Sequence, residues 1–407
     1  MTQIKHASAP LSSSPSPVQQ LRPDAPLVVI GSGLAGWTAA REFRKIDPKT
    51  PILMFTSDGG EFYAKPALSN AFAQNKDATQ LVTTSAEKMV STVGVTLVKN
   101  TVVTSIDAST QEVETSTGRY GYRQLVLATG ANPIKLPIEG EAFSEVMSIN
   151  SLKDYRAFRA KTATNARVLI IGAGLIGCEF ANDLGANGFN VHVVDPSPGP
   201  LNSLLPSRVS EELQNALSVI GIKWHLGTSV QTINYGAQST LNVTLMNGQS
   251  IEVDVVLSAV GLKAECTLAQ TAGAKCERGV LVDTKLQTRI EHIYALGDNT
   301  QYAAESVAGP ARTLPYVLPI MNAARALAQT LSGNPTQVVF PVMPVVIKTP
   351  AFPIVIAPAA PNVEGEWREL EKGIWNFFDQ RGDVRGFLLT GAQTTQRAEQ
   401  VKRIAAN

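Results

Sequence analysis

Two glycine-rich segments, about 140 residues apart, constrain the fold of this chain most strongly. They are PLVVIGSGLAGWTAAREFRKI at residues 26–46 and RVLIIGAGLIGCEFANDLGANG at residues 167–188. Each joins a short apolar run, a glycine turn and a stretch in which apolar residues recur at helical spacing. A strand, a tight turn and a helix open a βαβ unit. We therefore predict an α/β chain with two dinucleotide-binding domains.

The first loop fits the pattern G-x-G-x-x-G, which is formed by Gly31, Ser32, Gly33, Leu34, Ala35 and Gly36. Such glycines allow a tight turn and a close approach to a pyrophosphate, and the following helix offers its free N–H groups. An acid usually ends the second strand and holds the adenosine ribose. Phe55 and Thr56 occupy that place, which leaves Thr56, Ser57 or Asp58 as alternatives.

The second loop repeats the pattern and is followed by an acid in the expected place. Its candidate residues are Gly172, Gly174, Leu175, Ile176 and Gly177. Asp195 ends the next strand, 23 residues after Gly172, and the turn at 196–200 contains no Arg or Lys. A carboxylate accepts hydrogen bonds from a ribose 2′-OH and repels a 2′-phosphate, which favours NAD(H) over NADP(H). The alternative role of Asp195 is to cap a turn.

Composition narrows the class of protein. The formal net charge is +1 over 407 residues, so no global field attracts nucleic acid or an anionic membrane. Three cysteines without a CxxC pair fit a reducing cytoplasm, and no apolar run is long enough to span a bilayer. The four histidines show no ligand spacing, so we expect no metal. Residues 1–25, rich in Ser and Pro, predict a flexible tail.

Further motifs resemble those of the FAD-dependent pyridine nucleotide-disulfide oxidoreductase superfamily. They are LVLATGA at 125–131, DVVLSAVG at 254–261 and IYALGD at 293–298. Within that superfamily the chain is most similar to the rubredoxin–NAD reductases. That similarity is carried by KPALS at 65–69, GAGLIGCEFANDL, SAVGLK, ARALAQTLSGNP at 324–335 and PVMPVVIKTPA at 341–351.

The resemblance implies an α/β fold with two Rossmann-like, doubly wound domains of the three-layer β-β-α kind and a smaller α+β domain. The implied boundaries are 26–145 with 266–335 for a split FAD domain, 146–265 for the NAD domain and 336–407 for the C-terminal domain. In the last domain four runs read as strands, with a DQRGD turn between two of them and a helix from Thr394. The insert at 301–312 departs from the family's compact form.

The resemblance also assigns residues to the flavin. Asp298 would bind the ribityl chain, and Val317, at the start of a helix, would donate its N–H near flavin N1 and O2. The remaining FAD candidates are Val103, Thr129, Gly130 and Lys348, and Gly261 is assigned to NAD. Lys65 and Glu179 would form a pair beside the isoalloxazine as the catalytic residues. Their alternatives are a loop lysine and a solvated helix residue.

What is absent distinguishes this chain from other members of the superfamily. No cysteine lies between Ser57 and Val103, where thiol-dependent reductases carry theirs, and Cys178 is expected to be a packing residue. We therefore expect a cytoplasmic enzyme that passes electrons from NADH through FAD to rubredoxin or a similar small redox protein.

Other functions remain open at this stage. The acceptor could be a ferredoxin or flavorubredoxin. The last helix has too little apolar surface to anchor the chain to a membrane, which argues against a quinone reductase. A flavin- or nucleotide-sensing module is a further alternative, and unlike an enzyme it need not turn over NADH with any acceptor. Since rubredoxins are typically acidic, a local basic patch is expected to steer the partner. Its candidate members are Arg44, Lys45, Arg312 and charge near Lys348.

Overall fold

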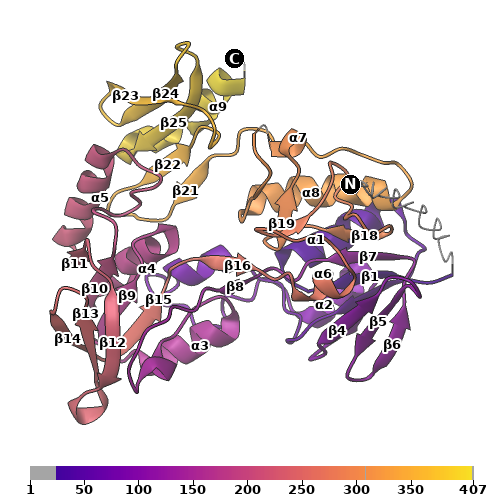
Figure 1. Ribbon diagram of the computed structural model, residues 1–407, viewed down its shortest axis with the longest axis horizontal. Helices are drawn as coiled ribbons and strands as arrows, with labels where there is room; N and C mark the ends of the chain where they lie inside the picture. The colour runs from indigo at the N-terminus through magenta and orange to yellow at the C-terminus, as the bar shows by residue number, and fades with distance from the viewer. Residues whose placement is uncertain (1–23, 308, 406–407) are drawn as a thin grey trace, which may run out of the picture.

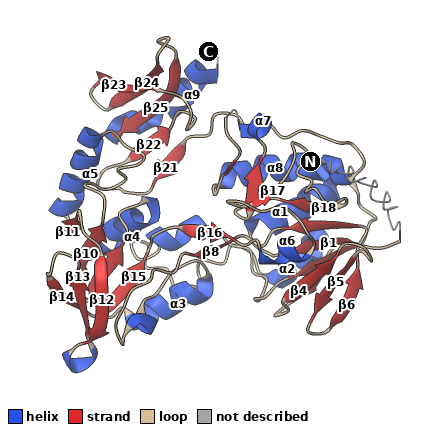
Figure 2. Ribbon diagram, in the orientation of Figure 1, coloured by secondary structure: helices blue, strands red, loops and turns tan. Residues whose placement is uncertain are grey.

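The computed structural model describes residues 24–307 and 309–405 and arranges them as three domains (Figure 1). The predicted flexible tail, apart from Asp24 and Ala25, lies outside the described residues. The fold class expected from the sequence is confirmed: two α/β domains lie side by side, and a smaller, mostly β domain stands over the second (Figure 2).

The first domain is built on a parallel sheet of order β18-β7-β1-β2-β3. Its strands are β1 (Leu27–Ile30), β2 (Ile52–Phe55), β3 (Thr96–Val98), β7 (Gln124–Leu127) and β18 (Ile293–Ala295). The helices α1 (Leu34–Ile46) and α8 (Val317–Leu331) pack together, and α2 (Ala86–Val93) lies nearby. An antiparallel layer of β4 (Val103–Asp107), β5 (Glu112–Thr115) and β6 (Gly118–Gly121) completes the domain.

The second domain repeats this plan with a parallel sheet of order β11-β10-β9-β15. Its strands are β9 (Arg167–Ile171), β10 (Asn190–Asp195), β11 (Lys223–Leu226) and β15 (Val255–Ser258). Its helices are α3 (Leu152–Lys161), α4 (Leu175–Gly185) and α5 (Ser207–Val219), and its antiparallel layer is β12 (Val230–Tyr235), β13 (Leu241–Leu245) and β14 (Ser250–Val253). Strand β1 is buried throughout and β9 is buried after Arg167, because helices and a second sheet cover their faces.

A two-stranded ribbon joins the two α/β domains. It pairs β8 (Ala131–Pro133) with β16 (Leu262–Ala264) in antiparallel register, and α6 (Thr267–Thr271) follows. Glu265 fastens the ribbon: its backbone N–H donates to Gly130 O at 2.9 Å, and Asn132 donates to its carboxylate at 2.5 Å. The insert after β18 contains β19 (Thr300–Tyr302), the short helix α7 (Ala304–Val307) and β20 (Arg312–Thr313). Strand β19 pairs with β20 and with β17 (Val280–Leu281), which precedes β18 in the chain.

The C-terminal domain is an antiparallel sheet of order β21-β22-β25-β24-β23 with one helix. The elements are β21 (Val345–Ile347), β22 (Ile354–Ala357), β23 (Gly365–Glu371), β24 (Ile374–Asp379), β25 (Val384–Thr390) and α9 (Arg397–Ala405). The DQRGD turn joins β24 and β25 as predicted. Strand β23 was not predicted, and the α-helix begins at Arg397 rather than Thr394, because residues 391–396 form a 3-10 turn.

The C-terminal domain shares a hydrophobic core with the second domain. Ile347, Ile354 and Trp375 belong to the same buried cluster as Val168 and Leu213. At the edge of this interface the Arg208 guanidinium, on α5, pairs with Glu369 at 2.8 Å and lies over the Trp375 ring. The two domains are therefore fastened together by apolar packing as well as by charge.

Across the described residues, no helix combines the length and apolar character needed to cross a membrane. The same part of the chain contains no cluster of three or more His, Cys, Asp or Glu side chains that could hold a metal ion.

Candidate functional site

The first glycine loop lies where β1 meets α1, and its three glycines serve different purposes. Gly31 has a φ of +106°, and a Cβ atom there would lie 2.2 Å from Ala128 O. A Cβ at Gly36 would lie 1.9 Å from Gly31 O, whereas a Cβ at Gly33 would meet nothing within 4 Å. The outer glycines therefore allow the turn to close, and Gly33 keeps the approach to the helix N-terminus open. This is the cradle that a pyrophosphate requires.

The carboxyl ends of β7 and β18 border the same cradle. Gly297, just before Asp298, has its backbone against α1, since a Cβ there would lie 2.8 Å from Ala35 Cβ. Burial raises the pKa of Asp298, while the positive charge of Lys65 opposes that shift. The buried Asn299 amide donates to Leu127 O and to Thr129 Oγ1, both at 3.1 Å. Asn299 thus fixes the residues that follow β7, Ala128 to Gly130, a role that the sequence did not indicate.

A polar network replaces the missing ribose acid at the end of β2. Ser32 Oγ donates to Thr56 Oγ1 at 2.7 Å, and Thr56 Oγ1 donates to Asp58 Oδ1 at 2.6 Å. Asp58 Oδ1 also accepts the Gly60 N–H at 2.9 Å. The carboxylate of Asp58 is therefore connected to the glycine loop through two hydroxyls, those of Ser32 and Thr56.

The second glycine loop has the same geometry. Gly172 has a φ of +107°, a Cβ at Gly177 would lie 1.9 Å from Gly172 O, and a Cβ at Gly174 would meet nothing within 4 Å. Asp195 accepts the Ala173 N–H at 2.7 Å and the Ser197 N–H at 2.7 Å. Asp195 therefore caps this turn, and the same two hydrogen bonds hold its carboxylate beside the glycine loop.

The other residues assigned to NAD lie around this loop. Leu175 and Ile176 form the first turn of α4, where Leu175 is half-buried and Ile176 is exposed. Gly261 is exposed and has a φ of +103° just after β15.

Glu179, in the second turn of α4, is the point at which the three domains meet. Its side chain is only 1% exposed. Ser69, on the 3-10 helix Lys65–Asn70, donates to Glu179 Oε2 at 2.6 Å. Lys348, which follows β21, donates its backbone N–H to Glu179 Oε1 at 3.0 Å and forms an ion pair with Oε2. A carboxylate with this many partners is stable although it is buried.

Among the described residues, no direct hydrogen bond or ion pair joins Lys65 to Glu179, the two residues that the resemblance places beside the isoalloxazine. Lys65 Nζ instead donates to Asn150 Oδ1 at 3.1 Å, and Asn150 in turn donates to Ala131 O at 2.8 Å. The physical reason is that Lys348 from the C-terminal domain already occupies the Glu179 carboxylate. Burial lowers the pKa of Lys65, and the negative charge of Asp298 opposes this effect.

Two neighbours of Glu179 on α4 were missed by the sequence analysis. Asn182 Oδ1 accepts the Ala351 N–H at 3.0 Å. Asp183 accepts the backbone N–H groups of Phe72 and Ala73 at 2.9 and 2.8 Å. The sequence did contain a signal for these two residues: with Glu179 they form a set of polar residues at positions i, i+3 and i+4 of an otherwise apolar helix. A helix that is buried on all sides tolerates polar side chains only where they have hydrogen-bond partners.

The start of α8 presents free backbone donors. Its N-cap, Tyr316, makes no side-chain cap, and Tyr316, Val317 and Leu318 are all exposed. Such a helix end attracts negative charge. Val103, the remaining candidate, is buried at the start of β4.

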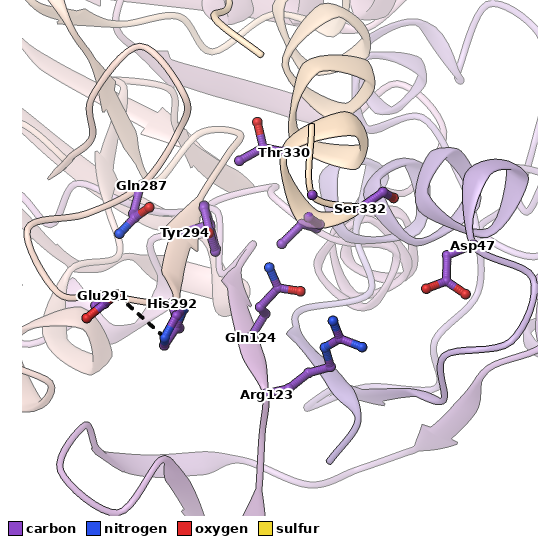
Figure 3. A pocket seen from close by; sticks show the side chains of 11 residues that line it. Asp47, Arg123, Gln124, Gln287, Glu291, His292, Tyr294, Thr330 and Ser332 are labelled. Atoms are coloured by element: carbon purple, nitrogen blue, oxygen red, sulfur yellow. Dashed lines mark ion pairs between the residues drawn. The ribbon is translucent and has the colours of Figure 1, made fainter. Parts of the chain in front are cut away.

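A separate pocket of about 300 Å³ lies away from these residues (Figure 3). Its walls include Asp47 after α1, Gln124 at the start of β7 and Ser332 after α8. These residues lie at the amino ends of the parallel strands of the first domain, opposite the edge that carries the first glycine loop and Asp298. Ligands of such sheets bind beyond the carboxyl ends of the strands, so we do not assign the dinucleotide to this pocket.

The expected basic patch is wrong for Arg44 and Lys45, because α1 carries them to that opposite edge. Arg44 donates to the carbonyl oxygens of Asp47, Thr50, Val93 and Gly94, and Lys45 pairs with Glu42 at 2.7 Å. Arg312 is half-buried and donates to Val307 O at 2.9 Å. Arg44 is therefore a structural residue that joins loops at the end of its helix.

Comparison with known proteins agrees with this geometry. Residues 25–328 match the family described as pyridine nucleotide-disulphide oxidoreductase. The chain belongs to the pyridine nucleotide-disulphide oxidoreductase family. Residues 337–404 also match the rubredoxin binding C-terminal domain.

Individual relatives share most of their length with this member of the family. The chain is 42% identical to rubredoxin-NAD(+) reductase of Alcanivorax borkumensis, over 94% of this chain and 99% of that one. It is 44% identical to rubredoxin-NAD(+) reductase of Acinetobacter baylyi, over 90% and 94%. The covalent putidaredoxin reductase–putidaredoxin complex matches with a TM-score of 0.85 at 22% identity, over 94% and 93%, which shows the shared fold.

Proposed function

We propose that the chain is an FAD-dependent NADH reductase that passes electrons to rubredoxin. The observation that carries the proposal is the match of residues 337–404 to a rubredoxin-binding domain, which contributes Lys348 to the candidate site. Electrons must leave the flavin for the partner, so a partner-binding domain that reaches the site is what this activity requires.

We assign FAD to the first glycine loop and NADH to the second. The FAD residues are Gly31, Ser32, Gly33, Leu34, Ala35, Gly36, Lys65, Val103, Thr129, Gly130, Glu179, Asp298, Val317 and Lys348. The NADH residues are Gly172, Gly174, Leu175, Ile176, Gly177, Asp195 and Gly261. The open backbone at Gly33 and at Gly174 fits a pyrophosphate in each case. When bound, FAD accepts a hydride from NADH and can release its two electrons one at a time to a one-iron acceptor.

The protein residues have distinct tasks in this scheme. The first turn of α8 directs N–H groups toward negative charge that develops on reduction. Lys65 and Asp298 influence one another electrostatically across the site. Glu179, held by Ser69 and Lys348, keeps the buried face of α4 polar and would help to orient the nicotinamide.

The test compares acceptors side by side. Purified rubredoxin, ferredoxin, flavorubredoxin and a quinone are offered to the enzyme with NADH, and ferricyanide serves as a control for the NADH half-reaction. We expect rubredoxin to be reduced fastest at equal concentration. Faster reduction of a ferredoxin or flavorubredoxin would replace the acceptor, and failure with every acceptor despite flavin reduction would favour a nucleotide-binding module.

The proposal also includes a cellular location and a set of domain boundaries. We place the enzyme in the cytoplasm, in keeping with its sparse, unpaired cysteines, and cell fractionation tests this. We also keep the domain boundaries 26–145 with 266–335, 146–265 and 336–407. Limited proteolysis with mass mapping of the first cuts tests those boundaries.

A further inference from the structure

Ser69 bridges the two charged groups at the meeting point of the domains. The residue is 2% exposed, its Oγ donates to Glu179 Oε2 at 2.6 Å, and it accepts from Lys348 Nζ at 2.7 Å. A hydroxyl has one proton to donate and two lone pairs. Pro66 O lies farther away, at 3.2 Å, so the charge-assisted bond to the carboxylate takes the proton. The Ser69 hydroxyl therefore sits between an anion and a cation in one defined orientation.

The three partners come from three different parts of the chain. Ser69 belongs to the 3-10 helix between β2 and α2, Glu179 to α4 of the second domain, and Lys348 to the C-terminal domain. Lys348 Nζ also donates to Pro66 O at 2.7 Å, so this ammonium contacts the 3-10 helix twice. The same short helix begins with Lys65, so a shift of it would move Lys65 and alter both of its contacts with Lys348.

We propose that Ser69 is a positioning residue for hydride transfer, which holds Glu179 and Lys348 in register with the flavin site. The inference rests on the proposed function and adds a residue to it. Without the hydroxyl, Glu179 Oε2 loses a partner in a place that water does not reach, and Lys348 loses one of its contacts with the 3-10 helix. A displacement of about 1 Å near reacting groups can cost on the order of a hundredfold in rate.

The experiment compares Ser69→Ala with Ser69→Thr, which keeps a hydroxyl. Ser332→Ala is the matched control, because it also removes a serine hydroxyl that donates a hydrogen bond, here to the backbone carbonyl Ala328 O at 2.8 Å, at the far end of α8. Stopped-flow absorbance measures flavin reduction by NADH from pH 6 to 9, and equilibrium titration measures FAD affinity. Hydrogen exchange of the Lys348 amide is followed in the apoprotein, since that N–H donates to Glu179.

For Ser69→Ala we expect flavin reduction to slow by about tenfold, with a changed pH profile and little change in the NADH concentration at half-saturation. The Lys348 amide should exchange about tenfold faster without any cofactor bound. Ser69→Thr should restore both quantities, and Ser332→Ala should alter neither.

Several outcomes would overturn the proposal. Unchanged flavin reduction in a fully folded Ser69→Ala protein would do so, as would equal defects in Ala and Thr variants that melt like the wild type. If the extra methyl group of Thr prevents folding, the Lys348 amide in folded Ser69→Ala decides the question, and exchange at the wild-type rate there argues against the hydroxyl. A wild-type enzyme that reduces its flavin but no rubredoxin refutes the proposed function and leaves the Ser69 result readable.

Discussion

Alanine at the middle glycine of each loop should separate cofactor binding from folding. Gly33 has φ −70° and ψ −172°, and Gly174 has φ −75° and ψ −170°, so alanine adopts either conformation without strain. A Cβ at these positions meets no protein atom within 4 Å. The folded apoprotein should therefore lose no more than about 1 kcal/mol, the typical effect of replacing an N-cap residue.

The outer glycines provide the contrast. A Cβ at Gly36 would lie 1.9 Å from Gly31 O, and one at Gly177 would lie 1.9 Å from Gly172 O. Carbon–oxygen contacts need more than 3 Å, so helix and loop must separate by over about 1 Å in a region that is densely packed. We expect Gly36→Ala and Gly177→Ala to cost at least about 1–3 kcal/mol of domain stability.

The assay pairs thermal melting of the apoproteins with the FAD content of purified protein and the KM for NADH. Gly33→Ala should melt normally yet bind FAD at least about tenfold more weakly, because its methyl group lies where the pyrophosphate approaches. Gly174→Ala should keep FAD and raise the KM for NADH. The assignment of the loops is refuted if Gly33→Ala retains full FAD affinity, or if Gly174→Ala loses FAD and leaves the KM unchanged.

Three further predictions concern charged groups. Lys348→Met should lower the free energy of local opening at this interface, measured by hydrogen exchange, by about 2–3 kcal/mol. The loss is smaller than for a fully buried ion pair because a quarter of the lysine side chain is exposed. Adding Glu179→Gln should restore part of that free energy, and additive effects of the two substitutions would contradict the pairing. NADH should exceed NADPH by about tenfold or more in kcat/KM, and Asp195→Asn should narrow the ratio; equal efficiencies in the wild type would contradict the role of Asp195. Burial, then His225 and Lys223, lower the pKa of His192 to about 4, so unfolding free energy should fall as pH drops from about 6.5 toward 4. That slope should flatten in His192→Gln, and an identical slope in both proteins would argue against His192 as its source.

Much of the fold was predictable because its strongest signals are local. The glycine loops, the apolar strands before them and the acid at Asp195 all lie within short windows of sequence. Strand β23 escaped prediction because four of the seven residues in its sequence, GEWRELE, are charged, and it is a largely exposed edge strand. Edge strands need little apolar surface, so composition gives them no clear signature.

The site was less predictable because its decisive contacts are remote in sequence. Ser69 lies 110 residues from Glu179, and Lys348 lies 169 residues from it. Family resemblance identified Glu179, Lys65 and Lys348, but packing decided which lysine occupies the carboxylate. Likewise, the sequence shows Arg44 only as a positively charged residue, whereas the structure shows that it donates hydrogen bonds to backbone carbonyl oxygens.

The core that the C-terminal domain shares with the second domain limits how this reductase can be recombined. Removing residues 336–407 would expose apolar side chains of α5 and leave Arg208 without Glu369 and Trp375. A chimera that exchanges only the C-terminal segment to change partner would inherit that exposed surface and tend to aggregate. The natural unit of exchange is the second domain together with the C-terminal domain, joined to the first domain at the β8–β16 ribbon and again near residue 336. Such an exchange would transfer nucleotide preference and partner choice together.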